Sequence, residues 1–288
     1  MIRRLALALL LALAACKPAP KPPEARPALW EVSGPHGEKA WLFGTIHALP
    51  QRVAWRSAKL DAALAAADEL VLEIAAIDDQ AGLEAEFARR ARSPGLPPLL
   101  DRVWPAQRGQ LAALLASKRI DPAPFRGLET WAAALALAQS LKGASDPGYG
   151  IDRELLAAAR GKPVAELEGA SAQLAVFDGL PEADQRDLLS ATVAEALAPD
   201  EEADSLAQAW GRGDMVRLEA ETRTGLLADP ELRAALLVER NRAWAAKIAA
   251  RLAGGDKPFV AVGAAHLAGP DGLPALLAAR GYTVVRLQ

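Results

Sequence analysis

Short apolar runs of strand length lie near both ends of this 288-residue chain, and a long segment of helical periodicity separates them. Near the start, Leu29–Val32 and Ala40–Phe43 flank a turn rich in glycine and proline, which predicts a β-hairpin. Near the end, Phe259–Val262 and Thr283–Leu287 flank a helical pattern over Leu273–Ala279. The pattern therefore predicts an α/β fold whose mixed, largely parallel sheet is built from both chain ends.

Further elements are predicted between these ends from apolar spacing and from cap signals such as Asp229–Pro230. Long helical patterns over Ala170–Ala253 predict a large helical insertion, a block at about residues 170–253. Two independent domains meeting near Pro163 are an alternative, because no flexible linker marks a boundary. The remaining predicted elements are helices over Ser57–Ala67, Thr130–Leu141 and Ile151–Arg160, and strands over Leu70–Leu72 and Pro163–Leu167.

The first 15 residues have the pattern of an export signal, with Arg3 and Arg4 before an apolar stretch too short to span a bilayer. The four residues that end at Cys16 resemble a bacterial lipobox, which predicts cleavage before Cys16 and its lipidation. An ordinary signal peptide with an incidental cysteine is the alternative. Lys17 favours outer-membrane sorting by the same resemblance, so we expect a cell-envelope lipoprotein that faces the periplasm.

Residues 16–27 are rich in proline and charge, as expected of a tether, and residues 28–288 form the predicted globular domain. Cys16 is the only cysteine, so no disulfide can form within the chain. The formal net charge is −3 and no dense basic stretch is present, so the sequence has no nucleic-acid-binding signature. No dimer face is indicated, so the oligomeric state stays open.

Two of the three histidines end the same G-x-x-H pattern, at His47 and His266, directly after predicted strands. Glu73 and Glu168 follow two other predicted strands. The carboxyl ends of parallel strands share one edge of a sheet, where active sites of α/β proteins assemble. We therefore expect these four side chains to converge there.

Imidazole and carboxylate groups suit a divalent metal such as zinc, manganese, cobalt or iron, which could activate water beside a carboxylate base. Each residue also has a structural interpretation. A histidine after a strand can form hydrogen bonds with backbone groups only, and Glu73 can cap the next segment. Glu166 is an alternative to Glu168 as the inward residue, because strand register is not readable from the sequence.

Several neighbours of these residues are candidates for supporting roles. Gly44 and Gly263 permit a sharp turn and close backbone approach, and Thr45 follows Gly44 directly. Asp152 fits a helix N-cap or a functional carboxylate. Arg240 and its neighbour Asn241 lie in the predicted helical stretch Pro230–Ala253, where Arg240 either faces solvent or points into a cleft and stabilises an oxyanion.

These residues together resemble the TraB/GumN family, which includes the Tiki metalloproteases and is similar in fold to erythromycin esterases and the haem-binding ChaN lipoproteins. The resemblance covers nearly the whole chain after the tether. It rests on these segments in order: Leu29-Trp30, Trp41 to His47, Leu70 to Glu73, Gly150 to Asp152, Leu167-Glu168, Gln173 to Asp178, Glu239 to Arg242, and Val262 to Leu273.

The resemblance implies one catalytic cleft in which His47, His266 and Glu73 bind a metal, manganese or cobalt by similarity to Tiki, with zinc also possible. Arg240 and Asn241 match a recurrent family position. Tiki-like activity implies cleavage of a peptide. This chain departs from Tiki in having a predicted amino-terminal lipid anchor in place of a carboxyl-terminal membrane span, so the peptide or small-molecule substrate in the envelope stays open.

The leading hypothesis is therefore an envelope-tethered, metal-dependent hydrolase of the peptidase type, in which Glu73 binds the metal or activates water. A lipoprotein that binds haem or another ligand without turnover is one alternative, because histidine and carboxylate also suit ligation. A metal-free, esterase-like hydrolase is another, with His47 as base and Glu73 orienting it. An envelope scaffold with a vestigial cleft is the last.

Overall fold

In the computed structural model, which describes residues 21–141, 145–198 and 200–288, both chain ends join one six-stranded sheet in the order β4-β3-β5-β2-β1-β6. The predicted signal peptide and Cys16 lie outside these residues. The strands are β1 (Leu29–Ser33), β2 (Lys39–Thr45), β3 (Glu69–Leu72), β4 (Val164–Glu166), β5 (Pro258–Gly263) and β6 (Thr283–Arg286). The predicted strands and the predicted fold class are thus confirmed.

The sheet is mixed, and its parallel part carries the residues of interest. Strands β4, β3, β5 and β2 pair in parallel, whereas β1 is antiparallel to both β2 and β6. In the β2–β5 register Gly44 lies opposite Val262 and Thr45 lies opposite Gly263, so the two G-x-x-H segments leave the sheet side by side. Because β4 pairs with β3, segments on both sides of Pro163 contribute to this sheet.

Helices form over the stretches where apolar spacing predicts them, whereas the helices over Gln80–Arg90 and Arg108–Lys118 were not predicted. Asp229 caps α10 by accepting a hydrogen bond from the Leu232 N–H, and Pro230 occupies its first position. The helices are α1 (Ala58–Ala66), α2 (Gln80–Arg90), α3 (Arg108–Lys118), α4 (Thr130–Ser140), α5 (Ile151–Ala158), α6 (Ala170–Asp178), α7 (Glu182–Leu197), α8 (Asp200–Gly211), α9 (Met215–Glu221), α10 (Pro230–Arg233), α11 (Glu239–Ala253) and α12 (Leu273–Ala278), with short 3₁₀ turns between them and a π-helical segment, η6 (Ala234–Val238), joining α10 to α11.

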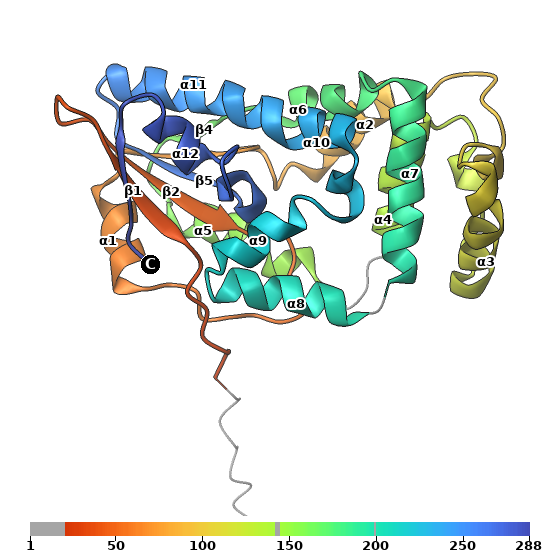
Figure 1. Ribbon diagram of the computed structural model, residues 1–288, viewed down its shortest axis with the longest axis horizontal. Helices are drawn as coiled ribbons and strands as arrows, with labels where there is room; N and C mark the ends of the chain where they lie inside the picture. Colours follow the sequence, from red (N-terminus) through yellow and green to blue (C-terminus); the bar gives the residue numbers. More distant parts are fainter. Residues whose placement is uncertain (1–20, 142–144, 199) are drawn as a thin grey trace, which may run out of the picture.

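Helices cover both faces of the sheet (Figure 1). Side chains alternate along a strand, so Trp41 and Phe43 of β2 point to one face while Ala40 and Leu42 point to the other. The first face packs against α1, α5 and the α8–α9 region, and the second packs against α11 and α12. The sheet is therefore the middle layer of an α/β/α arrangement.

A separate apolar core lies beside the sheet, in the helices drawn at the right of Figure 1. It centres on the fully buried Trp131 of α4 and includes side chains from α3 and α7. The predicted helical block at 170–253 is helical, but it does not form one unit. Helix α7 joins this second core, whereas α8, α9 and α11 pack on the sheet.

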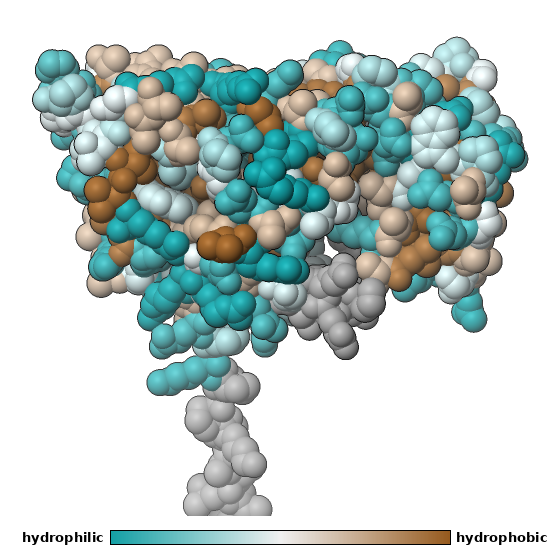
Figure 2. Space-filling model, viewed as in Figure 1, coloured by the Kyte–Doolittle hydropathy of each residue, from teal (hydrophilic) through white to brown (hydrophobic). Residues whose placement is uncertain are grey.

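The face shown in Figure 2 is mostly hydrophilic, and its apolar side chains form small, separate areas. Val216 of α9 is the most exposed large apolar residue, at 81%. Within the part of the chain that the structure describes, no helix has the length and apolarity needed to cross a bilayer.

Candidate functional site

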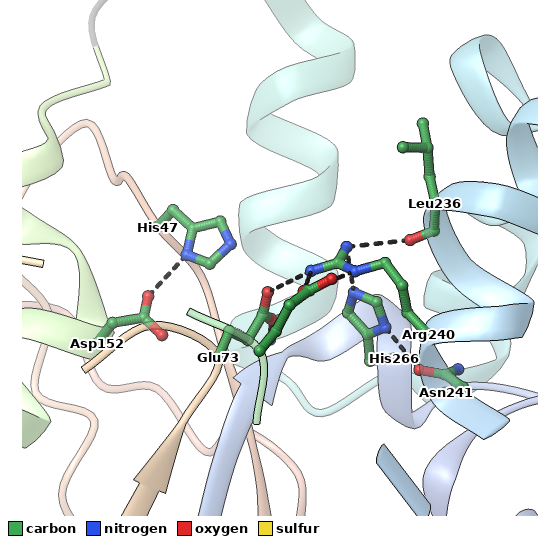
Figure 3. A network of polar contacts seen from close by, with 9 residues as sticks. His47, Glu73, Asp152, Leu236, Arg240, Asn241 and His266 are labelled. Carbon is green, nitrogen blue, oxygen red and sulfur yellow. Dashed lines mark hydrogen bonds and ion pairs between the residues drawn. The ribbon is translucent and has the colours of Figure 1, made fainter. Parts of the chain in front are cut away.

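Four predicted site residues lie together at the carboxyl edge of the parallel strands, and Figure 3 labels three of them, His47, Glu73 and His266. His47 follows β2, and His266 lies in the 3₁₀ turn η7 (Ala264–Leu267) that follows β5. Glu73 and Glu168 follow β3 and β4. The structure thus brings together side chains that are up to 219 residues apart in the sequence, from His47 to His266.

Arg240 of α11 joins the two glutamates of this cluster. Its Nη2 lies 3.1 Å from Glu73 Oε2 and 2.7 Å from Glu168 Oε2, and its Nε lies 3.0 Å from the same Glu168 oxygen. All three side chains are at most 10% exposed. Arg240 therefore points into the cluster rather than to solvent, and one guanidinium group is the counterion of two buried carboxylates.

Glu73 uses both carboxylate oxygens. Oε2 accepts from Arg240, and Oε1 accepts from the Gly263 N–H at 2.7 Å. Burial alone would raise the pKa of Glu73, but the charges of His266 when protonated, His47 and Arg240, together with the Gly263 N–H, lower it. Glu73 is thus ionised at neutral pH, and it acts as a hydrogen-bond acceptor rather than as a cap.

His47 is held by Asp152 of α5, whose Oδ2 lies 2.8 Å from His47 Nδ1. The His47 side chain is 67% exposed and that of Asp152 only 13%. The hydrogen bond to Asp152 raises the pKa of His47 to about 9, against the opposing effect of desolvation. Burial opposes ionisation of Asp152, but its hydrogen bond to His47 and the charge of His47 lower its pKa. His47 is therefore an imidazolium at neutral pH.

Two expectations about this pair are wrong. Gly150, not Asp152, is the N-cap of α5, and Asp152 stands in the first turn with its side chain turned toward His47. The carboxylate that orients His47 is Asp152 and not Glu73, because Glu73 is already engaged by Arg240 and Gly263. The sequence gives no local signal for this pairing, since 105 residues separate the partners.

The backbone around His47 is held against the start of α5. The Ile151 N–H donates to the Ile46 carbonyl at 2.9 Å, and Leu49 and Asp146 form a short antiparallel bridge. A Cβ atom on Gly150 would lie 2.3 Å from the His47 carbonyl oxygen. A glycine is therefore required at position 150 for this approach.

His266 has the opposite environment. It is buried, its Nδ1 lies 2.6 Å from Asn241 Oδ1, and its ring packs against Trp244 with centroids 4.5 Å apart. Its Nε2 lies 3.5 Å from Arg240 Nη1. Burial lowers the pKa of His266 to about 4, Glu73 opposes this shift, and Arg240 adds to it. His266 is therefore neutral at neutral pH.

Gly263 lies where the groups meet. A Cβ atom placed on Gly263 would be 3.4 Å from Glu73 Oε1, 3.7 Å from His266 Cδ2 and 3.7 Å from His47 Nε2. Both imidazoles and the carboxylate therefore border one small space, which any side chain at position 263 would fill.

The remaining candidates have mainly structural contacts. Gly44 allows close packing, since its Cβ would lie 3.2 Å from Ala264 Cβ. The buried Thr45 hydroxyl faces Asp152 and helps to lower the pKa of that carboxyl. Glu166 is exposed and accepts from the Ala75 N–H, so Glu168 is the inward residue of the two.

Trp244 was not predicted as part of the site. Its ring lies 4.6 Å from the Arg240 guanidinium carbon and packs on His266. The spacing of four residues from Arg240 places both on one helix face, which is the sequence signal that could have identified it.

We expect the Arg240→Met substitution to lower the free energy of unfolding by about 3–5 kcal/mol, because it removes the cation that pairs directly with the buried Glu73 and Glu168. The matched control is Arg242→Met, on the exposed face of the same helix, which should change stability by about 0.5 kcal/mol or less. Urea denaturation followed by circular dichroism measures both. Equal stability of the two variants would contradict the role of Arg240 as counterion.

Comparison with known proteins identifies the family of this chain. Residues 28–286 match the model of the TraB/PrgY/gumN family. The chain is 30% identical over 256 residues to the uncharacterized protein YbaP of Escherichia coli (strain K12) and, equally, to that of Shigella flexneri, covering 86% of this chain and 90% of each relative. No solved structure gives a significant match. The predicted resemblance is confirmed, and the chain belongs to the TraB/PrgY/gumN family.

Proposed function

We propose that this protein is a hydrolase that cleaves peptide bonds with a water molecule activated in the space over Gly263. The observation that carries the proposal is the convergence of a cationic imidazole, a neutral imidazole and an ionised carboxylate on that space. Titratable groups pushed to opposite charge states at one place are typical of acid–base catalysis. The peptide substrate is proposed from the resemblance to Tiki.

The charge states of the two histidines indicate the catalytic role of each in this proposal. His266 is neutral and takes the proton of the attacking water, and the ionised Glu73 beside it stabilises the imidazolium that results. Arg240 and the His47 imidazolium stabilise the oxyanion that forms on the carbonyl oxygen. His47 then gives its proton to the departing amine, and Asp152 holds the ring in place during this transfer.

The Gly263→Ala substitution tests the shared space. Its Cβ meets the surrounding atoms at ordinary contact distances, so we expect an unchanged fold and a fall in kcat/KM of about 100-fold or more, the lower range for losing acid–base catalysis. His47→Ala should give a similar loss. Gly109→Ala is the control, because a Cβ there meets no atom within 4 Å. Mass spectrometry of the products formed from a peptide mixture measures kcat/KM, and melting temperatures show whether the fold is unchanged.

The proposed acid also predicts the pH dependence of the wild-type rate. His47 donates a proton only while it is protonated, so kcat/KM should fall as the pH rises through about 9. A rate that rises through this range would contradict the acid role of His47. Ligand binding without turnover would instead favour the binding lipoprotein.

Metal dependence is the second candidate. Each imidazole has its Nδ1 held by a side chain, which is how metal-bound histidines are commonly oriented. As arranged, however, the residues do not fit a metal. No three His, Cys, Asp or Glu side chains within the described ranges form a metal-binding group, and the Arg240 guanidinium pairs with Glu73 and reaches His266.

We expect hydrolysis to survive exhaustive chelation. The check is metal content and titration with manganese, cobalt and zinc, comparing wild type with the His47→Ala, His266→Ala double variant. If chelation abolishes activity, and stoichiometric binding is lost in the double variant, the metal-dependent mechanism replaces the one proposed here.

We also propose that Cys16 is lipidated and that the protein faces the periplasm from the outer membrane. The support is the export-signal and lipobox pattern in the first 16 residues. Mass spectrometry of the mature amino terminus should find a diacylglyceryl group on Cys16. A Cys16→Ser variant should lose it, and an unmodified mature cysteine in the wild type would contradict the anchor.

A further inference from the structure

Asn241 lies between His266 and a backbone carbonyl, and it is completely buried. Its Nδ2 lies 2.8 Å from the Asp271 carbonyl oxygen, and its Oδ1 lies 2.6 Å from His266 Nδ1. A carbonyl oxygen can only accept a hydrogen bond, so the amide nitrogen must face Asp271. The amide oxygen then faces His266 and can only accept, which requires a proton on His266 Nδ1.

The other side of the ring has the complementary requirement. His266 Nε2 lies 3.5 Å from Arg240 Nη1, and a guanidinium nitrogen can only donate. A proton on Nε2 would bring two donors together, whereas a lone pair there can accept from Arg240. Both ring nitrogens therefore agree on one neutral tautomer, with the proton on Nδ1.

The orientation of Asn241 is itself held in place. The Asp271 side chain accepts from Arg233 Nη2 at 2.8 Å, and Arg233 Nε donates to the Thr222 carbonyl at 3.1 Å. The segment that carries the Asp271 carbonyl is thus fastened to neighbouring structure. If the Asn241 amide rotated by half a turn, it would lose its hydrogen bond to the Asp271 carbonyl and place its own Oδ1, an acceptor, against that carbonyl oxygen.

We propose that Asn241 is a positioning residue that keeps His266 in the tautomer protonated at Nδ1, so that the Nε2 lone pair is presented to the site. The consequence for catalysis rests on the proposed function, in which His266 Nε2 accepts the proton of water. The tautomer itself does not depend on that function. In enzymes that use a histidine base, loss of the correct tautomer lowers kcat by up to about 10⁴-fold.

Imidazole ¹⁵N spectra of the full chain measure the tautomer directly at pH 7. The chain has only three histidines, and His36→Gln and His47→Gln variants assign the signals. We expect wild-type His266 to show a protonated Nδ1 and an unprotonated Nε2. A protonated Nε2 in the wild type overturns the proposal, whatever happens to the variants.

Asn241→Leu removes the acceptor at nearly constant volume, so its His266 should move toward the tautomer protonated at Nε2, and kcat should fall at least about tenfold with KM nearly unchanged. Asp271→Asn is the matched control. It weakens the contact with Arg233 but keeps the backbone carbonyl, and should therefore keep the tautomer. An unchanged tautomer in Asn241→Leu overturns the proposal.

The two proposals fail in distinguishable ways. A wild type with the expected tautomer and no hydrolysis contradicts the proposed function alone. A hydrolytic wild type whose His266 is protonated at Nε2 contradicts the role of Asn241 alone. If Asn241→Leu does not fold, Asn241→Ser supplies the comparison, because the shorter side chain cannot span from His266 to Asp271. His266 in this variant should also move toward the tautomer protonated at Nε2, and an unchanged tautomer overturns the proposal.

Discussion

One guanidinium group allows two glutamate side chains to be buried at the carboxyl edge of the sheet. Arg240 contacts Glu73 and Glu168 directly, and it offsets much of the cost of removing both carboxylates from water. The same contacts hold α11 over the ends of β3 and β4 and place Trp244 against His266. The π-helical segment before α11 contributes the Leu236 carbonyl, which accepts from Arg240 Nη1 at 3.1 Å. The charge balance of the cluster and the packing of this helix are therefore coupled.

The two G-x-x-H segments show how one local pattern acquires two chemical states. His47 is largely exposed and its Nδ1 faces a carboxylate, which stabilises the imidazolium. His266 is buried and its Nδ1 faces an amide, so no fixed negative charge offsets the cost of burying a positive one at that nitrogen. The pKa of His47 rises to about 9 and that of His266 falls to about 4. The different charge states of the two histidines follow from these surroundings and not from the motif.

The chain belongs to the TraB/PrgY/gumN family, but membership of a family does not transfer a substrate. The proposed hydrolysis would take place in the space bordered by Glu73 and the two imidazoles. Gly263 leaves this space open, and Gly150 lets the His47 backbone approach α5. At both positions the absence of a Cβ atom permits this geometry.

Local pattern in the sequence determined the secondary structure and the edge of the sheet at which the site lies. Apolar runs, the Asp229–Pro230 cap and the turn residues are short-range signals, and parallel strands necessarily bring their carboxyl ends together. These signals were sufficient to predict that His47, Glu73, Glu168 and His266 lie near one another. They also predicted that residues 170–253 are helical.

Only the tertiary structure decided which groups pair. Asp152 fits a cap by sequence and instead holds His47, and Arg240 lies 167 residues from the Glu73 that it neutralises. The direction of Arg240, the choice of Glu168 over Glu166 and the separate packing of α7 and α11 depend on contacts between distant segments. Periodicity gives the repeat of a helix or strand, but burial and charge partners, which shift each pKa, exist only after the elements have packed.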